Sequence, residues 1–397
     1  MQTRKTALVV LMAVILITLP LFGGQAGAAE KKLKIGFCGP LSGGAASWGM
    51  CQLNSVRHYA DKSNKAGGMK LGDDRVFFEV FGEDSKYVAS EAVAGVTKLI
   101  HVAGVKYLFL MGAVETMAVN RMANDERVPI FCGAWGDVLG PDYPMTFRYI
   151  IDGDASTLAQ AAFVKKRYPE IKTVATLNAD NDSGHGTAKN AGALWEALGV
   201  KRVENAFYEE GAIDFFPVMT KIIKKKPDFI DLGMTVPGNI PLVVEAARDL
   251  GYTGQFTSGG IPDQPIKGVI TVGIVPGDPK ESQAQKEYRE AYMAEHGALH
   301  SWWEFYANGT YSFFKSFLPD AQSGDAEVVY KTITAPGYKF DTWWGKSYWF
   351  GKDIWGADRN LASWVPIKKG TGDKWVQLTY VPTEDYFPLY KIVKKNK

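Results

Sequence analysis

The residues of this chain that could do chemistry stand directly after its apolar runs. Trp48 closes the glycine-rich stretch IGFCGPLSGGAASWG, Glu115 lies in GAVET, and Ser183 lies in ADNDSGHG. An indole offers an apolar face that can also attract a cation, whereas a carboxylate or hydroxyl orients a molecule by hydrogen bonding. The glycine-rich stretch lacks both the Lys-Ser/Thr of a phosphate loop and the G-x-G-x-x-G spacing of a dinucleotide site. These residues therefore favour binding of a small molecule that is not a nucleotide.

Catalytic signatures are missing from the sequence. It contains no H-E-x-x-H zinc helix and no G-x-S-x-G elbow, and its five histidines show no ligand spacing beyond one i, i+4 pair. A hydrolase built from Asp182, Ser183 and His185 is imaginable, but groups adjacent in sequence rarely converge as a triad. We therefore expect no enzyme activity, no catalytic residue, no metal and no cofactor.

The first 30 residues carry the features of a secretory signal peptide. They comprise the basic start MQTRK, an apolar run over 7–22 and the small-residue pattern Ala26-Gly27-Ala28. A membrane anchor is the alternative, but the run is shorter than the roughly 18–20 apolar residues that a span needs. We predict cleavage near Ala28 and a periplasmic location.

The net charge limits the classes of partner, and the cysteine content limits the disulfides that the protein can form. The 45 basic and 43 acidic residues give a net charge of +2, which argues against a nucleic acid or an acidic membrane surface as the main partner. Three cysteines, Cys38, Cys51 and Cys132, are too few for a disulfide framework. One disulfide with one free thiol and a set of buried thiols are both compatible with the sequence.

Two series of alternating strands and helices must position the residues named above. In the first series, strands over 33–38, 76–81, 107–111 and 129–135 alternate with helices over 51–64, 90–101 and 117–125. A second series begins near Ala155 and runs to QFTSGG. Such alternation indicates parallel sheets covered on both faces, and ligands bind beyond the carboxyl ends of such strands. Two lobes whose strand ends face each other would enclose a cleft.

The order of motifs resembles the type I periplasmic binding proteins, and more narrowly the branched-chain amino acid (leucine/isoleucine/valine) binding family of ABC importers. The resemblance is carried by IGFCGPLSGGAASWG, NKAGGMKLGDDRVFFEVFGED, VPIFCGAW, ADNDSGHG and ARDLGYTGQFTSGG, and it covers essentially the whole mature chain. It implies an α/β fold of two Rossmann-like, doubly wound lobes joined by a three-crossing hinge. With a signal peptide over 1–28, we expect lobe 1 to comprise 29–150 plus 272–338, and lobe 2 to comprise 151–271 plus 339–397.

The resemblance also assigns ligand-binding positions, among them an aromatic that stacks on the ligand and a turn that holds its carboxylate. These positions are Trp48, Val114, Glu115, Thr116, Ala134, Trp135, Ser183, Thr235, Val236, Gly260 and Ile261. Here Glu115 stands in the turn that is serine-rich in the family, and Gly260 and Ile261 replace the glutamate that meets an ammonium group. Since a buried unpaired charge is costly, we expect an aromatic or amine-bearing solute first, with an aliphatic amino acid close behind.

The expected function is an extracytoplasmic solute-binding protein of an ABC importer. The ligand would favour the closed state by touching both lobes at once. The partners would be a small molecule and the membrane permease, with no nucleic acid and with the protein a monomer. A ligand-sensing subunit for a membrane receptor and a secreted hydrolase are the alternatives, and the sequence does not name the ligand.

Overall fold

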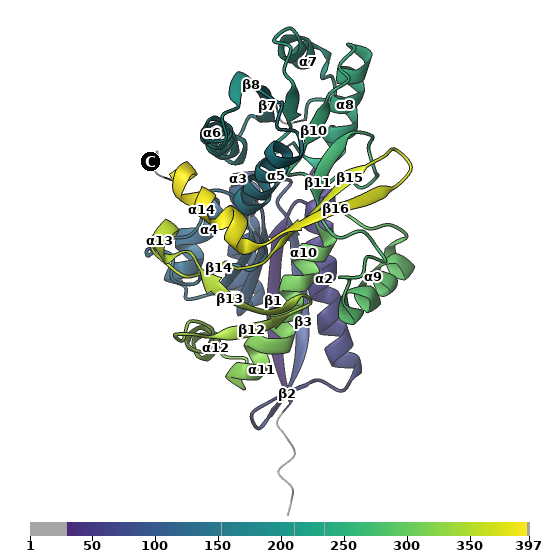
Figure 1. The fold of residues 1–397 in the computed structure, drawn as a ribbon. Coiled ribbons are helices and arrows are strands. Elements are labelled where there is room, and N and C mark those ends of the chain that lie inside the picture. Colours follow the sequence, from purple (N-terminus) through teal and green to yellow (C-terminus); the bar gives the residue numbers. More distant parts are fainter. Residues whose placement is uncertain (1–29, 152, 210, 234, 395–397) are drawn as a thin grey trace, which may run out of the picture.

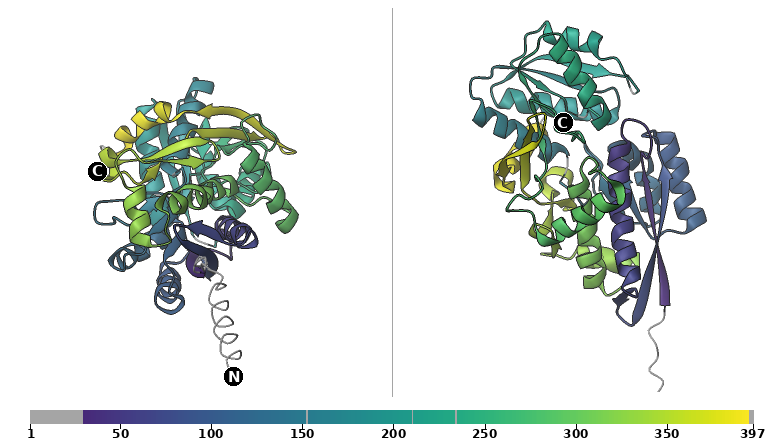
Figure 2. Two further views of the ribbon diagram at one scale, coloured as in Figure 1. Left: turned by 90° about the horizontal axis from the view of Figure 1, so that it is seen from below. Right: turned by 90° about the vertical axis from the view of Figure 1, so that its right-hand side faces the viewer.

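Two β-sheets, each covered by helices, form the two lobes of the protein (Figures 1 and 2). The computed structural model describes residues 30–394 except 152, 210 and 234, so the predicted signal peptide lies outside the described residues. Within this part of the chain, no helix is long and apolar enough to cross a membrane. The chain passes between the lobes three times, and the two doubly wound lobes with a three-crossing hinge expected from the sequence are confirmed.

The first sheet has nine strands in the order β12-β13-β14-β6-β5-β4-β1-β3-β2. The early strands are β1 (Glu30–Gly39), β2 (Met69–Leu71), β3 (Asp74–Asp84), β4 (Tyr107–Met111), β5 (Ile130–Gly133) and β6 (Thr146–Arg148). β1 pairs in parallel with β3 and β4, and β5 and β6 continue the parallel array. All five residues of β4 are buried, as expected for a parallel strand that is covered on both faces.

Helices of the first lobe come from two distant stretches of the chain. The first stretch supplies α2 (Ala46–Lys65), α3 (Ala89–Lys98), the π-helical turn η1 (Leu99–Ala103) and α4 (Ala113–Asp125). The second supplies α9 (Gln283–His296), α10 (Trp303–Ser312), η3 (Phe313–Phe317), α11 (Leu318–Ala321) and α12 (Ala326–Ile333). α10 packs along α2, which brings the two stretches into one core. Cys38, Cys51 and Cys132 are all buried in this lobe as free thiols.

The second sheet has seven strands in the order β16-β15-β11-β10-β9-β7-β8. Its strands are β7 (Thr173–Ala179), β8 (Lys201–Tyr208), β9 (Phe229–Asp231), β10 (Gln255–Thr257), β11 (Val269–Val272), β15 (Val365–Gly370) and β16 (Trp375–Val381). Its helices are α5 (Gly153–Arg167), α6 (Asp182–Ala197), α7 (Phe216–Ile223), the short η2 (Pro237–Asn239), α8 (Ile240–Asp249) and α14 (Thr383–Lys394). β7 to β11 are parallel, whereas β15 and β16 return antiparallel at the edge beside β11.

The last crossing lies later in the chain than the sequence suggested. We expected 339–397 in lobe 2, but β12 (Lys339–Thr342), β13 (Gly345–Phe350) and β14 (Asn360–Leu361) extend the first sheet, with α13 (Lys352–Trp355) between the last two. The third crossing therefore lies between Leu361 and Val365. The aromatic rings of Phe340 and Trp349 pack on Phe317, whose ring belongs to the first core. The aromatic, strand-like pattern of this segment does not indicate which of the two cores will bury it. The pairing of its strands with the first sheet shows that it belongs to lobe 1.

A buried ion pair joins the lobes at the hinge. Glu304 on α10 and Lys368 on β15 are both buried, with 3.9 Å between Glu304 Oε1 and Lys368 Nζ. Burial raises the pKa of Glu304 and lowers that of Lys368, and each charge opposes the shift of the other. Gly273, at φ 124°, follows β11 at this point, and a Cβ there would overlap Glu304 Oε1 and come within 2.6 Å of Lys368 Nζ. The glycine therefore makes room for the pair.

Removing one member of this pair should destabilise the protein strongly. Lys368→Met leaves the Glu304 carboxylate buried without its cation, so we expect the free energy of unfolding to fall by about 3–5 kcal/mol. The double variant Glu304→Gln/Lys368→Met should recover more than half of that loss. Urea denaturation at pH 7 measures both, with the exposed Lys267→Met as control. A loss for Lys368→Met no larger than that of the control would contradict this account.

Candidate functional site

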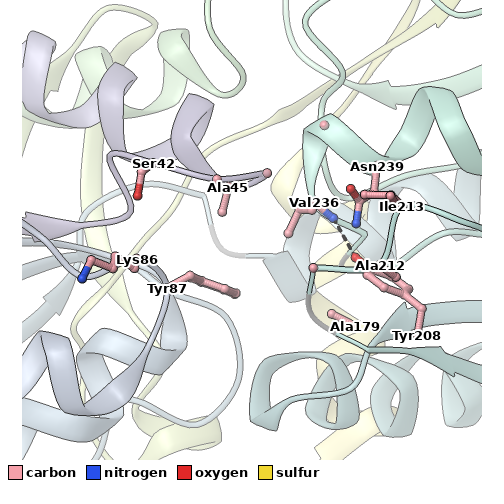
Figure 3. Close-up of a pocket in the computed structure, with 14 residues that line it drawn as sticks. Ser42, Ala45, Lys86, Tyr87, Ala179, Tyr208, Ala212, Ile213, Val236 and Asn239 are labelled. Carbon is pink, nitrogen blue, oxygen red and sulfur yellow. Dashed lines mark hydrogen bonds between the residues drawn. The ribbon is translucent and has the colours of Figure 1, made fainter.

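Described residues of both lobes together line a larger and a smaller space. The larger, called here the outer hollow, has a volume of about 410 Å3 and is lined by 14 residues from both lobes (Figure 3). They are Ser42, Gly43, Gly44, Ala45, Lys86 and Tyr87 from the first lobe, and Ala179, Tyr208, Gly211, Ala212, Ile213, Val236, Gly238 and Asn239 from the second. The smaller, called the inner space, has a volume of only about 10 Å3. It is lined by Trp48, Met111, Gly112, Ala113, Gly133, Trp135, Ser183, Trp302 and Tyr306.

The glycine-rich loop after β1 allows the two lobes to touch through their backbones. Gly43 adopts φ 72°, a conformation that glycine enters without strain. Gly238 N donates a hydrogen bond to Gly44 O across the cleft at 3.4 Å. A Cβ on Gly44 would meet Val236 Cγ2 at 3.3 Å, which is tighter than ordinary contact. The small residues at 43–45 thus form the first-lobe wall of the outer hollow and bring it close to η2.

Asp84, the last residue of β3, organises the neighbouring turn. Its carboxylate accepts hydrogen bonds from Leu41 N, Lys86 N and Ser42 Oγ, each at 2.8 Å. Partial burial disfavours the charged form, but these donors outweigh it, and the pKa of Asp84 is lowered. Lys86 and Tyr87 are consecutive non-glycine residues at φ 53° and 63°. Strain of this kind persists only where surrounding bonds hold it, and it often marks functional sites.

The inner space is closed by aromatic rings. Trp302 Nε1 donates to Gly259 O at 3.0 Å, and the Trp302 ring lies 5.6 Å from that of Trp135. Tyr306 Oη donates to Gly133 O at 3.4 Å. A cavity of this volume has room for about one water molecule.

Trp48 and Ser183 face the inner space from opposite lobes. Trp48 is only 2% exposed, and its ring meets that of Tyr87 edge-on at 5.9 Å. Trp48 Nε1 and Ser183 Oγ have no hydrogen-bond partner within the described part of the chain. Two buried polar atoms from opposite lobes are therefore directed at the same small space.

Four of the residues that the sequence assigned to the site face these spaces. Trp48, Trp135 and Ser183 line the inner space, and Val236 lines the outer hollow, where its N–H donates to Tyr208 Oη at 3.1 Å.

Val114, Glu115 and Thr116 line neither space, although Gly112 and Ala113 of the same turn line the inner space. Ser85 Oγ donates to Glu115 Oε1 at 2.6 Å, and Thr116 Oγ1 donates to Gly112 O at 2.7 Å. Val114 packs against the first core. Glu115 also lies in the first turn of α4, where the helix dipole favours a carboxylate.

The remaining assigned residues are also buried away from both spaces. They are Ala134, Thr235, Gly260 and Ile261. Thr235 Oγ1 donates to Leu177 O at 3.5 Å, and Gly260 packs on Thr235 O. These residues support the loops at the strand ends from behind.

Five further lining residues were not expected from the sequence: Tyr87, Tyr208, Tyr306, Ile213 and Asn239. Tyr87 and Tyr208 stand just past or at the end of a strand, which is a signal that could have found them. Tyr306 lies on α10, more than 150 positions from the loop that it touches, so only the folded chain brings it to the site.

The imagined hydrolase constellation is not assembled in the described residues. His185 Nε2 lies 2.7 Å from Asp180 Oδ1, and its ring packs on Phe207 at 4.3 Å. Ser183 Oγ, which would be the nucleophile, has no hydrogen-bond partner in this part of the chain. Within the described residues, no three His, Cys, Asp or Glu side chains lie together so that they could hold a metal ion.

Two doubly wound lobes with three crossings and lining residues from both sides define the class of two-lobed, periplasmic-type binding folds. The sequence profile of the periplasmic binding proteins matches residues 32–357, and the chain belongs to that family. A curated relative, the leucine-, isoleucine-, valine-, threonine- and alanine-binding protein of Pseudomonas aeruginosa, is 25% identical over 233 residues. The match spans 57% of this chain and 60% of that relative's length.

Solved structures show the same fold. A periplasmic binding protein from Burkholderia mallei has a TM-score of 0.75 at 19% identity, covering 90% of this chain and 96% of its own. A leucine-binding protein from Thermotoga maritima has a TM-score of 0.74 at 17% identity, covering 89% and 99%. A solute-binding protein of an ABC transporter from Rhodopseudomonas palustris, in complex with 3,4-dihydroxybenzoic acid, has a TM-score of 0.71 at 21% identity, covering 89% and 98%.

Asp84→Ala should loosen the turn that borders the outer hollow. The Leu41 and Lys86 amides lose a charged acceptor, so we expect their hydrogen exchange to accelerate roughly tenfold, with Asp61→Ala as the exposed control. Because the pKa of Asp84 is lowered from 3.8, the wild-type bonds should persist at neutral pH and fail only as the pH falls below about 4. NMR-detected exchange, corrected for intrinsic rates, measures this. Unchanged protection in Asp84→Ala would show that other contacts hold the turn.

Proposed function

We propose that this protein is a periplasmic solute-binding protein of an ABC importer, which holds a small amphipathic solute between its lobes and presents it to a membrane permease. The observation that carries the proposal is the pair of interlobe spaces, because each is lined by residues of both lobes. A ligand placed there stabilises the closed arrangement by contacting both walls at once. Membership of the periplasmic binding protein family supports the location and the role.

Direct bonds between the lobes support closure as the mechanism. Ser47 Oγ in the first turn of α2 donates to Asp263 Oδ1, beyond β10, at 2.6 Å. The same hydroxyl accepts from Ser301 N at 2.8 Å, in the segment that leads into α10. One serine thus joins the first lobe, the second lobe and the hinge, and opening must break its bond to Asp263.

The chemistry of the lining residues supports binding rather than catalysis. The rings of Trp48, Trp135 and Tyr87 offer apolar contact, and burial of an aromatic ring contributes on the order of 1–3 kcal/mol. Their polar atoms orient a solute by hydrogen bonding. The relatives carry amino acids or aromatic acids in their names, which suits an amphipathic solute. The protein acts as a monomer, and no enzymatic role is proposed.

A thermal-shift screen tests the function. Amino acids, aromatic acids, amides and amines are added one by one, and a solute that binds only the folded form must raise the melting temperature. At 100 times its dissociation constant the gain is about 2.7 kcal/mol, which corresponds to a shift of several degrees. No shift from any member of the four classes would count against the proposed function.

Ser47→Ala should weaken binding of the solute found by that screen, because the closed state loses its bond to Asp263. We expect a three- to tenfold rise in the dissociation constant by calorimetry, from a faster off-rate. Ser90→Ala is the matched control, since Ser90 occupies the same position in the first turn of α3, a helix of the same lobe. An equal effect of both substitutions would argue against closure through Ser47.

A further inference from the structure

We propose that the solute lies in the outer hollow rather than in the inner space, and that it is an uncharged molecule with a flat apolar body larger than a free amino acid. The inference rests on the proposed function and specifies the position and class of the solute. Four aromatic residues that line the inner space, Trp48, Trp135, Trp302 and Tyr306, act as the floor of the site. They are called the aromatic floor below.

The aromatic floor is built to stay closed. A Cβ on Gly133 would overlap the Tyr306 ring, and a Cβ on Gly259 would come within 2.6 Å of Trp135 Cη2. The rings of Tyr306 and Trp135 are therefore each seated in a notch that only a glycine leaves open. Hydrogen bonds from Tyr306 Oη to Gly133 O and from Trp302 Nε1 to Gly259 O hold the rings there.

The volumes of the two spaces indicate which of them can hold a ligand in the closed arrangement. Small-molecule sites usually enclose about 300–1,000 Å3, whereas the inner space holds about 10 Å3. In the closed arrangement, an amino acid could occupy the inner space only by parting the lobes at the hydrogen bond from Trp302 Nε1 to Gly259 O or by displacing the floor. The outer hollow, at about 410 Å3, already falls in the usual range and holds a body of two fused rings.

The charge of the outer hollow favours a neutral solute. None of its 14 described lining residues is acidic, and its one cationic side chain, Lys86, pairs with Glu91 Oε1 at 3.3 Å. Figure 3 shows the Lys86 ammonium turned away from the second lobe. A charged group enclosed there would lack a free partner of opposite charge, which is costly.

The walls of the outer hollow favour a flat apolar body. Tyr87 and Tyr208 stand on opposite lobes on its two sides (Figure 3). At the rim, Ile213 is 84% exposed beside Ala212, so its side chain is available to a solute. A ring system seated between the tyrosines would cover Ile213, and the Asn239 amide can hydrogen-bond to its polar edge.

Three solutes and four substitutions test the proposal. The solutes are 2-naphthamide, its charged counterpart 2-naphthoate, and leucine, each titrated by calorimetry. Ile213→Asp places a charge at the rim, Ala212→Trp fills the hollow, and Ser183→Ala alters the inner space. Val102→Asp is the matched control for Ile213→Asp, because Val102 is 80% exposed on η1 of the first lobe.

We expect 2-naphthamide to bind at least tenfold more tightly than 2-naphthoate or leucine. Ala212→Trp should weaken it at least tenfold and Ile213→Asp at least fivefold, while Val102→Asp stays within twofold and Ser183→Ala weakens it less than Ile213→Asp does. Since Ile213 is almost fully exposed, its substitution remains informative if Ala212→Trp does not fold. Tighter binding of leucine or 2-naphthoate, or a tenfold loss in Ser183→Ala with none in Ile213→Asp, would overturn the proposal while the proposed function stands. No binding by these three or by any screened solute would overturn both.

Discussion

Close approach between the lobes, at positions where a side chain is absent, is the constraint on which the rest of this site depends. Gly44 and Gly238 meet through their backbones, and Gly133 and Gly259 leave notches for the rings of Tyr306 and Trp135. A Cβ on Gly259 would lie 2.6 Å from Trp135 of the other lobe, and one on Gly44 or Gly238 would make a tight contact of 3.3 Å across the cleft, whereas Gly133 makes room for Tyr306 within the first lobe. Because protein interiors leave almost no spare volume, a methyl group at one of the three interlobe positions would push the lobes apart. The glycines therefore decide how near the lobes come, and through that distance they set the size of both interlobe spaces.

Two ionic features act at different depths and do different work. Asp84 is partly exposed and bonds three neighbouring groups, so its effect is to shape a turn that borders the outer hollow. Glu304 and Lys368 are buried where the chain crosses between the lobes, and there the pairing offsets a large desolvation cost. The first feature positions wall residues, whereas the second keeps β15 and α10 in register at the hinge.

The departures from the family pattern have a consistent physical meaning. Glu115, which replaces a serine, is bonded by Ser85 at the start of α4 instead of facing a solute. Gly260 and Ile261, which replace a glutamate, are buried behind the second-lobe loops. The Glu115 carboxylate is bonded to Ser85, and positions 260 and 261 carry no carboxylate. The lining of the outer hollow therefore consists mainly of apolar and hydroxyl-bearing side chains.

The order of strands and helices and the two doubly wound lobes could be predicted from the sequence, because apolar runs, glycine stops and helical periodicity are local signals. The same signals placed Trp48, Trp135, Ser183 and Val236 at strand ends, where the structure brings them between the lobes. The tertiary structure alone decided which sheet receives 339–361 and which of the strand-end residues face inward. It also brought Trp302 and Tyr306 from the hinge into the floor of the site. These outcomes depend on packing between segments more than 100 positions apart, and a local pattern carries no information about which distant surface will bury a given ring.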